Sequence, residues 1–295
     1  MSGSERLGGV AATILLVCCV AWGLNQVAIK ISLAGVSPLL GAGLRSFIAA
    51  VLVWAWCRLR GEPLLTRDGT WGYGLFIGLL FAAEFVFIYG GLAFTTASRS
   101  VIFLYSAPFF VALGAHVFIP EERLTRSRVT GLIVAFVGLC LAFVDGLALP
   151  SRRELLGDGL ELIGGLLWAA TTIIVKARRD RRLTPQRTLF YQLTVSAVAL
   201  TGLSALIGER GVTAVTGPVA AAIAYQSVIV AFVSYLIWFW LLQRYPASGL
   251  AAFSFWTPIF GVLAGWLVLG ERLTGKLGAA AVLVAVGIYL VNRRA

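Results

Sequence analysis

Histidine and acidic residues are scarce in this chain of 295 residues. It contains one histidine, four cysteines and 13 aspartate or glutamate residues, against 24 lysine or arginine residues. The cysteines, Cys18, Cys19, Cys57 and Cys140, lie in or at the end of apolar stretches, so they suggest neither a disulfide framework nor a set of metal ligands. With a single histidine and no Cys/His/Asp cluster, we expect no metal site.

Sequence signatures of catalysis are missing as well. An enzyme inside a membrane needs a nucleophile with its base, or a metal ion, at membrane depth. The sequence has no Gly-x-Ser-x-Gly, no second histidine and no Walker motif. It therefore argues against an enzyme and predicts no cofactor. For a transporter, it leaves an ion or substrate gradient as the source of energy.

What the chain has in abundance is apolar sequence. Hydrophobic residues make up 59% of it and charged residues 13%, and its mean hydropathy is +0.91. About 20 apolar residues span a bilayer core as a helix. Ten stretches of that kind use most of the chain, which predicts an all-α integral membrane protein with ten transmembrane helices. They fall at about 10–33, 38–57, 71–92, 96–118, 129–147, 157–177, 187–207, 218–242, 247–269 and 276–291.

The net charge of +11 follows the membrane topology and does not indicate nucleic-acid binding. If the N-terminus is cytoplasmic, 16 of the 24 basic residues fall on the cytoplasmic side, two lie within spans, and six are external. Basic residues in short loops favour the cytoplasm. We therefore expect a multi-pass protein of the plasma (inner) membrane with both termini in the cytoplasm. The six external residues are Arg99, Arg152, Arg153, Arg210, Arg272 and Lys276.

A nine-residue pattern occurs twice. Trp22 to Lys30 reads WGLNQVAIK, and Trp168 to Lys176 reads WAATTIIVK. Five spans separate the copies, and an odd number means that the two halves cross the membrane in opposite senses. Inverted repeats of this kind are typical of secondary transporters. The sequence predicts two five-helix repeats, 1–150 and 151–295.

Further paired features support the duplication. Ala97 and Pro108 are matched by Ala247 and Pro258, with the same spacing of 11 residues. A proline inside a helix removes a backbone hydrogen bond and kinks the helix. Pro108 and Pro258 are therefore candidate hinges, although the kinks could instead only shape the packing. Each pair is followed by Glu-Arg-Leu-Thr, at 122–125 and 271–274, where the threonines could cap the next helix.

These paired motifs resemble the drug/metabolite transporter superfamily, and specifically its EamA-type ten-helix exporters. The resemblance covers essentially the whole chain. It implies a ten-helix bundle around a central cavity lined by helices 1, 3, 4, 6, 8 and 9. It also implies export of small metabolites such as amino acids by alternating access.

Ionisable residues inside the apolar stretches each need a reason, because a charge is costly at membrane depth. Glu84 is the clearest case and, from the sequence, the lone carboxylate in mid-membrane. It could contact a substrate amine, couple transport to protons, or make a structural ion pair. Lys30 could snorkel outward, bind a carboxylate or pair with Glu84. For Arg45 we expect snorkelling or an ion pair.

The repeated pattern places polar and aromatic residues on one helix face, since positions i, i+4 and i+8 align. We expect Trp22, Asn25, Gln26, Lys30, Trp168 and Thr172 to contact substrate, although polar residues can also hold helices together. Among the many aromatics of the fourth and eighth stretches, Tyr105, Tyr235 and Trp238 are candidates for the same site. The remaining aromatics are expected to face lipid or the membrane interfaces.

The sequence thus predicts a secondary transporter that exports small amphipathic metabolites, with amino acids, including aromatic ones, as the leading candidates. The lipid bilayer and a small-molecule substrate are the expected partners, with protons as a candidate coupling ion. Two alternatives stay open. One is an uncoupled channel or facilitator, and the other is an exporter of drugs, nucleosides or sugars.

Overall fold

The computed structural model describes residues 7–66, 68–147, 149–178, 180, 182–270, 272–273 and 275–293. Their regular structure is helical, apart from one isolated antiparallel bridge between Val36 and Val212. The helices are α1 (Gly9–Ser32), α2 (Pro38–Leu59), α3 (Trp71–Leu92), α4 (Ala97–Leu104), α5 (Ala107–Phe118), α6 (Arg126–Phe143), the short 3₁₀ turn η1 (Val144–Gly146), α7 (Arg152–Arg178), α8 (Pro185–Leu206), α9 (Gly217–Tyr225), the π-helical segment η2 (Gln226–Ser234), α10 (Tyr235–Arg244), α11 (Ala247–Phe253), α12 (Trp256–Leu269) and α13 (Leu277–Asn292).

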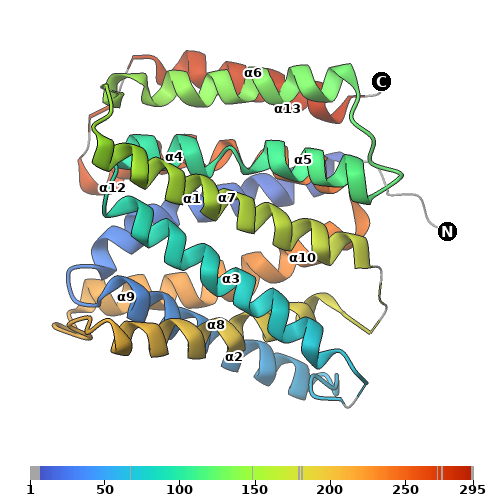
Figure 1. Ribbon diagram of the computed structural model, residues 1–295, viewed down its shortest axis with the longest axis vertical. Coiled ribbons are helices and arrows are strands. Elements are labelled where there is room, and N and C mark those ends of the chain that lie inside the picture. The colour runs from blue at the N-terminus through green and yellow to red at the C-terminus, as the bar shows by residue number, and fades with distance from the viewer. Residues whose placement is uncertain are drawn as a thin grey trace.

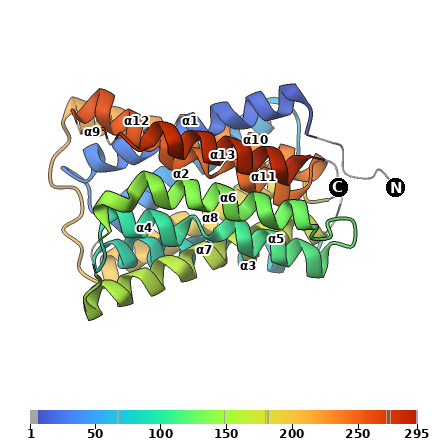
Figure 2. The same cartoon turned by 90° about the horizontal axis from the view of Figure 1, so that it is seen from above.

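The helices form a bundle whose members run between two ends, and α1 begins at the end where α13 finishes (Figures 1 and 2). Within the described residues, nine helical stretches are long and apolar enough to cross a membrane. The tenth, α13, has 16 residues and is as apolar in composition. The prediction of an all-helical membrane protein is confirmed.

Helices of the two sequence halves pack against each other. The most extensive contacts join α6 to α13, α2 to α8, α3 to α7, and α1 to α12. Each of these four pairs takes one helix from each half. Figure 1 shows α6 beside α13 along one edge of the bundle and α2 beside α8 along the other. The halves therefore interlock, and most of the core lies between them.

Glycine permits the closest of these contacts. A Cβ atom on Gly287 of α13 would lie 2.5 Å from the Ala135 nitrogen and from the Gly131 oxygen of α6. On the other side, a Cβ on Gly131 would lie 2.6 Å from the Gly287 oxygen. In lipid, packing supplies much of the energy of helix association, and small residues let backbones meet. The α6–α13 pair therefore depends on these two positions.

Two of the membrane-crossing stretches are interrupted near their prolines. The fourth stretch breaks between α4 and α5 at Tyr105 and Ser106, and Pro108 is the second residue of α5. The ninth breaks between α11 and α12 at Ser254 and Phe255, close before Pro258. The predicted kinks are therefore present at equivalent places in both halves. A hinge motion at them stays a prediction.

The eighth stretch departs from the expected continuous α-helix over 218–242. Nine residues, Gln226–Ser234, are π-helical. Such segments are rare in proteins overall, but those that occur are frequently found at functional sites. Two buried side chains help to hold it. Ser227 Oγ donates to the Ile223 oxygen, and Gln226 Nε2 donates to Ser32 Oγ of α1 at 3.0 Å. In the sequence, the polar residues within this apolar stretch do not indicate a π-helix.

Charged side chains cap several helix ends inside the bundle. Both carboxylate oxygens of buried Glu122 accept backbone hydrogen bonds, from Ala247 at 2.9 Å and Ser248 at 3.2 Å, at the start of α11. Lys176 Nζ donates to the Leu242 oxygen at 2.7 Å near the end of α10. The predicted Thr125 cap of α6 is confirmed by its bond to the Arg128 nitrogen. Glu271 and Thr274, the other copy, lie outside the described residues.

We predict that Gly287→Ala destabilises the protein and that Gly278→Ala does not. Both glycines are on α13, but a Cβ on Gly278 would meet nothing within 4 Å. Overpacking a tight contact costs about 1–3 kcal/mol, so the melting temperature in detergent should fall by several degrees for Gly287→Ala only. Equal melting temperatures for the two variants would show that the α6–α13 contact tolerates a methyl group.

Candidate functional site

Three tryptophans from different helices meet at the middle of the bundle. The Trp22 ring of α1 lies 5.7 Å from that of Trp238 on α10, edge to face. The Trp168 ring of α7 lies 6.2 Å from that of Trp238, in a tilted arrangement. Trp238 is buried, whereas Trp22 and Trp168 keep part of their surface accessible. The two copies of the repeated pattern thus meet through an aromatic residue of a third helix.

The π-helical segment fixes the orientation of Trp22. Its indole nitrogen donates to Ser234 Oγ at 2.8 Å, and that hydroxyl donates to the Val230 oxygen at 2.7 Å. A buried indole N–H usually needs a partner. Ser234 is the last residue of η2 and corresponds by the internal repeat to Glu84. The altered winding therefore places a hydroxyl where the other half has a carboxylate.

A second row of aromatic rings leads from Trp238's helix to α3. Tyr235 lies 6.1 Å from Phe81, edge to face, and Phe81 lies 5.0 Å from Phe85 in the same manner. Edge-to-face pairs of this kind add to the stability of apolar packing. The tryptophans and this row together form the aromatic cluster, which consists of Trp22, Phe81, Phe85, Trp168, Tyr235 and Trp238.

A buried cation and a buried carboxylate border the aromatic cluster. The Arg45 guanidinium of α2 lies over the Phe85 ring, 4.5 Å from its centre. Arg45 is 1% exposed and Glu84 of α3 is 7% exposed, and their charges interact with each other and with Tyr235. Arg45 Nε and Nη2 and Glu84 Oε2 have no hydrogen-bond partner.

Unpaired polar atoms of this kind are uncommon in buried positions and call for an explanation. Charged groups are especially costly to leave without hydrogen bonds. Here two guanidinium nitrogens and one carboxylate oxygen of opposite charge remain available beside the same aromatic surface. These charges and rings are complementary in chemistry to a molecule that carries both charges and an apolar part.

Of the predicted site residues, five converge on the cluster: Trp22, Glu84, Trp168, Tyr235 and Trp238. Asn25 is buried with its Oδ1 unpaired, and Thr172 is buried on α7. Tyr105 is half-buried at the break between α4 and α5.

The two other predicted residues of the α1 stripe lie elsewhere. Gln26 is exposed beside Gly261 of α12, and Lys30 is exposed near the end of α1. The cation that acts on Glu84 is Arg45. The i, i+4, i+8 spacing places these residues on the face of α1 that carries Trp22, but among them only Trp22 contacts a ring of the cluster.

Sequence analysis does not identify Arg45 as a site residue, and it predicts Glu84 to be the lone carboxylate in mid-membrane. Of its two expected roles for Arg45, snorkelling is wrong, because the guanidinium is buried between helices. Glu84 is also not the lone buried carboxylate. Asp158 is 3% exposed and Glu161 is 0% exposed on α7. They were overlooked because they stand at the start of the expected sixth span, whereas α7 begins five residues earlier, at Arg152.

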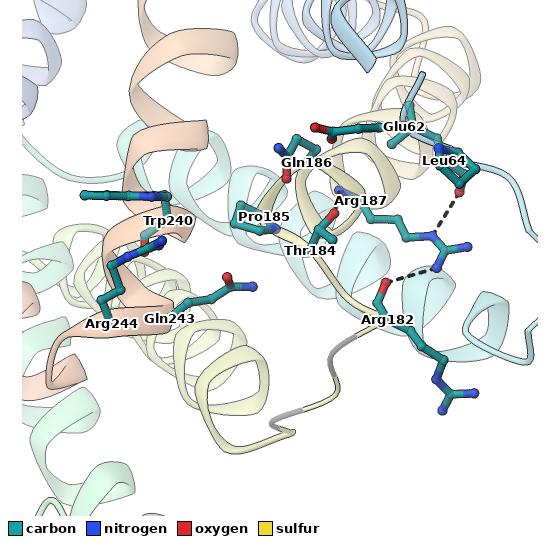
Figure 3. A pocket seen from close by; sticks show the side chains of 11 residues that line it. Glu62, Leu64, Arg182, Thr184, Pro185, Gln186, Arg187, Trp240, Gln243 and Arg244 are labelled. Atoms are coloured by element: carbon teal, nitrogen blue, oxygen red, sulfur yellow. Dashed lines mark hydrogen bonds between the residues drawn. The ribbon is translucent and has the colours of Figure 1, made fainter. Parts of the chain in front are cut away.

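A pocket of about 470 Å³ lies away from the cluster, at the end of the bundle where α8 begins and α10 finishes (Figure 3). Trp240 and Arg244, stacked 4.3 Å apart, form one wall. Figure 3 shows the Arg187 side chain on the other side, turned toward the oxygens of Leu64 and Arg182, to which it donates hydrogen bonds. Arg187 has a structural role in this pocket, because it joins the α2–α3 connection to α8. We therefore place the candidate site at the aromatic cluster and not at this pocket.

The sequence profile of the EamA-like transporter family matches this chain twice, over residues 9–144 and 155–293. The chain belongs to the EamA-like transporter family. As a member of that family it is a multi-pass membrane transporter with small-molecule substrates, and the expected resemblance is confirmed.

Relatives of known name support the assignment. The chain is 28% identical over 297 residues to a probable amino-acid metabolite efflux pump of Escherichia coli (strain K12), covering 97% of this chain and 95% of the relative. A protein of the same description from Salmonella typhimurium is 29% identical, covering 94% and 93%. A solved crystal structure matches with a TM-score of 0.82 and 19% identity, over 97% of this chain and 96% of the other, which supports the fold.

We predict that Arg45 and Glu84 stabilise each other. Arg45→Gln or Glu84→Gln alone leaves one buried charge uncompensated, whereas the double substitution removes both, so it should cost less than the sum of the single changes. A coupling of about 0.5–3 kcal/mol is expected for such neighbours, measured by melting temperatures in detergent. Arg45→Gln combined with Asp145→Asn, an exposed acid of η1, serves as the control and should be additive.

Proposed function

We propose that this transporter exports small amphipathic metabolites, foremost amino acids with aromatic or other apolar side chains, by alternating access around the aromatic cluster. The orientation that goes with this proposal has both termini in the cytoplasm, in the plasma (inner) membrane. The end at which α1 begins is then cytoplasmic, and the end that carries the α3–α4 and α6–α7 connections is external.

The observation that carries the proposal is the set of polar atoms of Arg45 and Glu84 that lack hydrogen bonds beside the cluster. The free Arg45 nitrogens suit a substrate carboxylate, since a guanidinium can make two hydrogen bonds to one. The free Glu84 oxygen suits an ammonium group. The rings of Trp22, Trp168 and Trp238 suit the apolar side chain of the same molecule. A zwitterion would satisfy both charges at once, and the cost of burying them would fall.

The interrupted helices support alternating access. Transporters with inverted repeats work by rocking one part against another around a site near the middle of the membrane. The breaks before Pro108 and Pro258 divide the fourth and ninth stretches at equivalent places, so each can bend there. Tyr105 stands at one of these breaks, next to the candidate site. The names of the two bacterial relatives agree with export of amino-acid metabolites.

To test the function, purified protein in proteoliposomes would be loaded with labelled phenylalanine, leucine, glutamate, a nucleoside, a sugar or a cationic drug. We expect export and exchange of phenylalanine and leucine. Flux of only the nucleoside or only the sugar would show that the proposed substrate class is wrong. Flux that never proceeds uphill under an imposed ion gradient would favour the uncoupled facilitator.

To test the aromatic cluster, we predict that Trp238→Ala and Trp168→Ala each lower phenylalanine flux at least tenfold. Each substitution removes a ring that the substrate would contact. The matched control is Trp54→Ala, because Trp54 is exposed on α2 and should retain wild-type flux. Unchanged flux in both cluster variants would remove the site from the aromatic cluster.

To test the charges, phenylalanine would be compared with phenethylamine, which lacks the carboxylate. Arg45→Gln should weaken competition by phenylalanine by about 10- to 100-fold, the range of one or two charge-assisted hydrogen bonds. It should leave competition by phenethylamine nearly unchanged. Glu84→Gln should weaken both compounds. An Arg45 variant that weakens both equally would contradict the assignment of the carboxylate to Arg45.

A further inference from the structure

A second group of buried charges lies between α4 and α7, toward the end of the bundle opposite to where α1 begins. Arg99 Nε donates to both oxygens of Asp158, at 3.2 and 3.1 Å, and its Nη2 also contacts that carboxylate. The Thr95 hydroxyl donates to the same carboxylate at 2.7 Å. Arg99 and Asp158 are both largely buried. This contact closes α4 onto α7.

Glu161 lies one turn further into the bundle, and its carboxyl group is only half satisfied. Its Oε1 accepts a hydrogen bond from Ser100 Oγ at 2.7 Å. Its Oε2 has no hydrogen-bond partner, and the residue is 0% exposed. On the α3 side it packs against Gly91, where a Cβ atom would lie only 2.8 Å from Glu161 Cγ.

The charges around Glu161 do not balance an ionised carboxylate. On α4 the facing cation is Arg99, which is bonded to Asp158. On α7 the nearby charges are Asp158 itself and the acid Glu154 one turn earlier, both of which would repel a further negative charge. On α3 the contact is Gly91, and the acid on that helix is Glu84, two turns further in. A carboxyl in such surroundings is most easily buried with a proton on it.

The same contact is built on a helix that ends at a break. Arg99 and Ser100 both belong to α4, which is separated from α5 by the break at Tyr105 and Ser106. If α4 bends away there, Asp158 loses Arg99 and Glu161 loses Ser100. Glu161 then faces water and can exchange a proton with it.

We propose that Glu161 is a proton-binding site and that a proton on Glu161 is required for α4 to close onto α7 at the external side. The proposal rests on the proposed function, since it assigns a step of the transport cycle. When the contact is open, the ionised carboxylate takes a proton from external water. The neutral acid is then buried, with Ser100 on one oxygen. Transport thereby becomes dependent on external pH at a residue outside the substrate site.

The experiment measures phenylalanine exchange in proteoliposomes at constant internal pH while the external pH is varied. If phenylalanine is not exchanged, the member of the same panel that the wild type exchanges fastest replaces it. Wild-type exchange should change with external pH by up to about tenfold per pH unit, the slope given by one titrating group. Glu161→Gln, which is neutral at every pH, should remove that dependence while keeping exchange. Asp145→Asn, which changes an exposed acid of η1, should behave as the wild type does.

Wild-type exchange that ignores external pH, or a Glu161→Gln protein that keeps the wild-type pH profile, would overturn the proposal. If Glu161→Gln does not exchange substrate, Ser100→Ala is used, because it retains the carboxyl and removes its hydrogen bond. A midpoint displaced from the wild-type value supports the proposal, and an identical profile refutes it. Absence of exchange for every compound in the wild type would instead count against the proposed function.

Discussion

The organisation of this bundle depends on how its buried charges are compensated. A charge between apolar helices is stable only with a partner close by. Several charges here have one. Buried Glu122 accepts hydrogen bonds from the start of α11, and buried Arg99 binds buried Asp158. Half-buried Glu209 accepts from the Leu39 and Leu40 nitrogens of α2, and half-buried Lys176 donates to carbonyls near the end of α10. The contacts of Glu122, Glu209 and Arg99 join the two sequence halves, whereas Lys176 and its partners all belong to the second half. Arg45, Glu84 and Glu161 each keep at least one unpaired polar atom, and we place substrate and proton binding there.

The two halves are similar at the ends of α2 and α8 but differ at the centre of the bundle. Ser204 Oγ donates to Glu209, and in the other half Cys57 Sγ lies 4.0 Å from Glu62, five residues on in both cases. The halves have kept equivalent acids at the ends of α2 and α8 but have diverged at the centre. Glu84 is matched by Ser234, which orients Trp22 instead of carrying charge. The central site therefore has the Glu84 carboxylate opposite the Arg45 guanidinium, with a hydroxyl at the equivalent place of the other half.

Much of the fold could be read from the sequence, because apolar length and paired motifs are local signals. The spans, the two breaks near Pro108 and Pro258, and the meeting of Trp22 with Trp168 follow from such patterns. The π-helical segment does not, since its winding is stabilised by contacts such as Gln226 with Ser32 of another helix. Arg45 was missed for a related reason. Its distance from the helix end allows snorkelling or burial equally, and only the packing of α2 against its neighbours decides between them.

The position of α4 connects the two sites. Tyr105, a candidate substrate contact, directly follows the last residue of α4. Arg99 and Ser100, near the start of α4, make hydrogen bonds to α7. A substrate that draws Tyr105 and the tryptophans together would act on the same rigid segment that closes over Glu161. Because α4 has only eight residues, little of that displacement can be absorbed within it. The two sites are then coupled in both directions, since any ligand that favours one position of α4 must alter binding at the other.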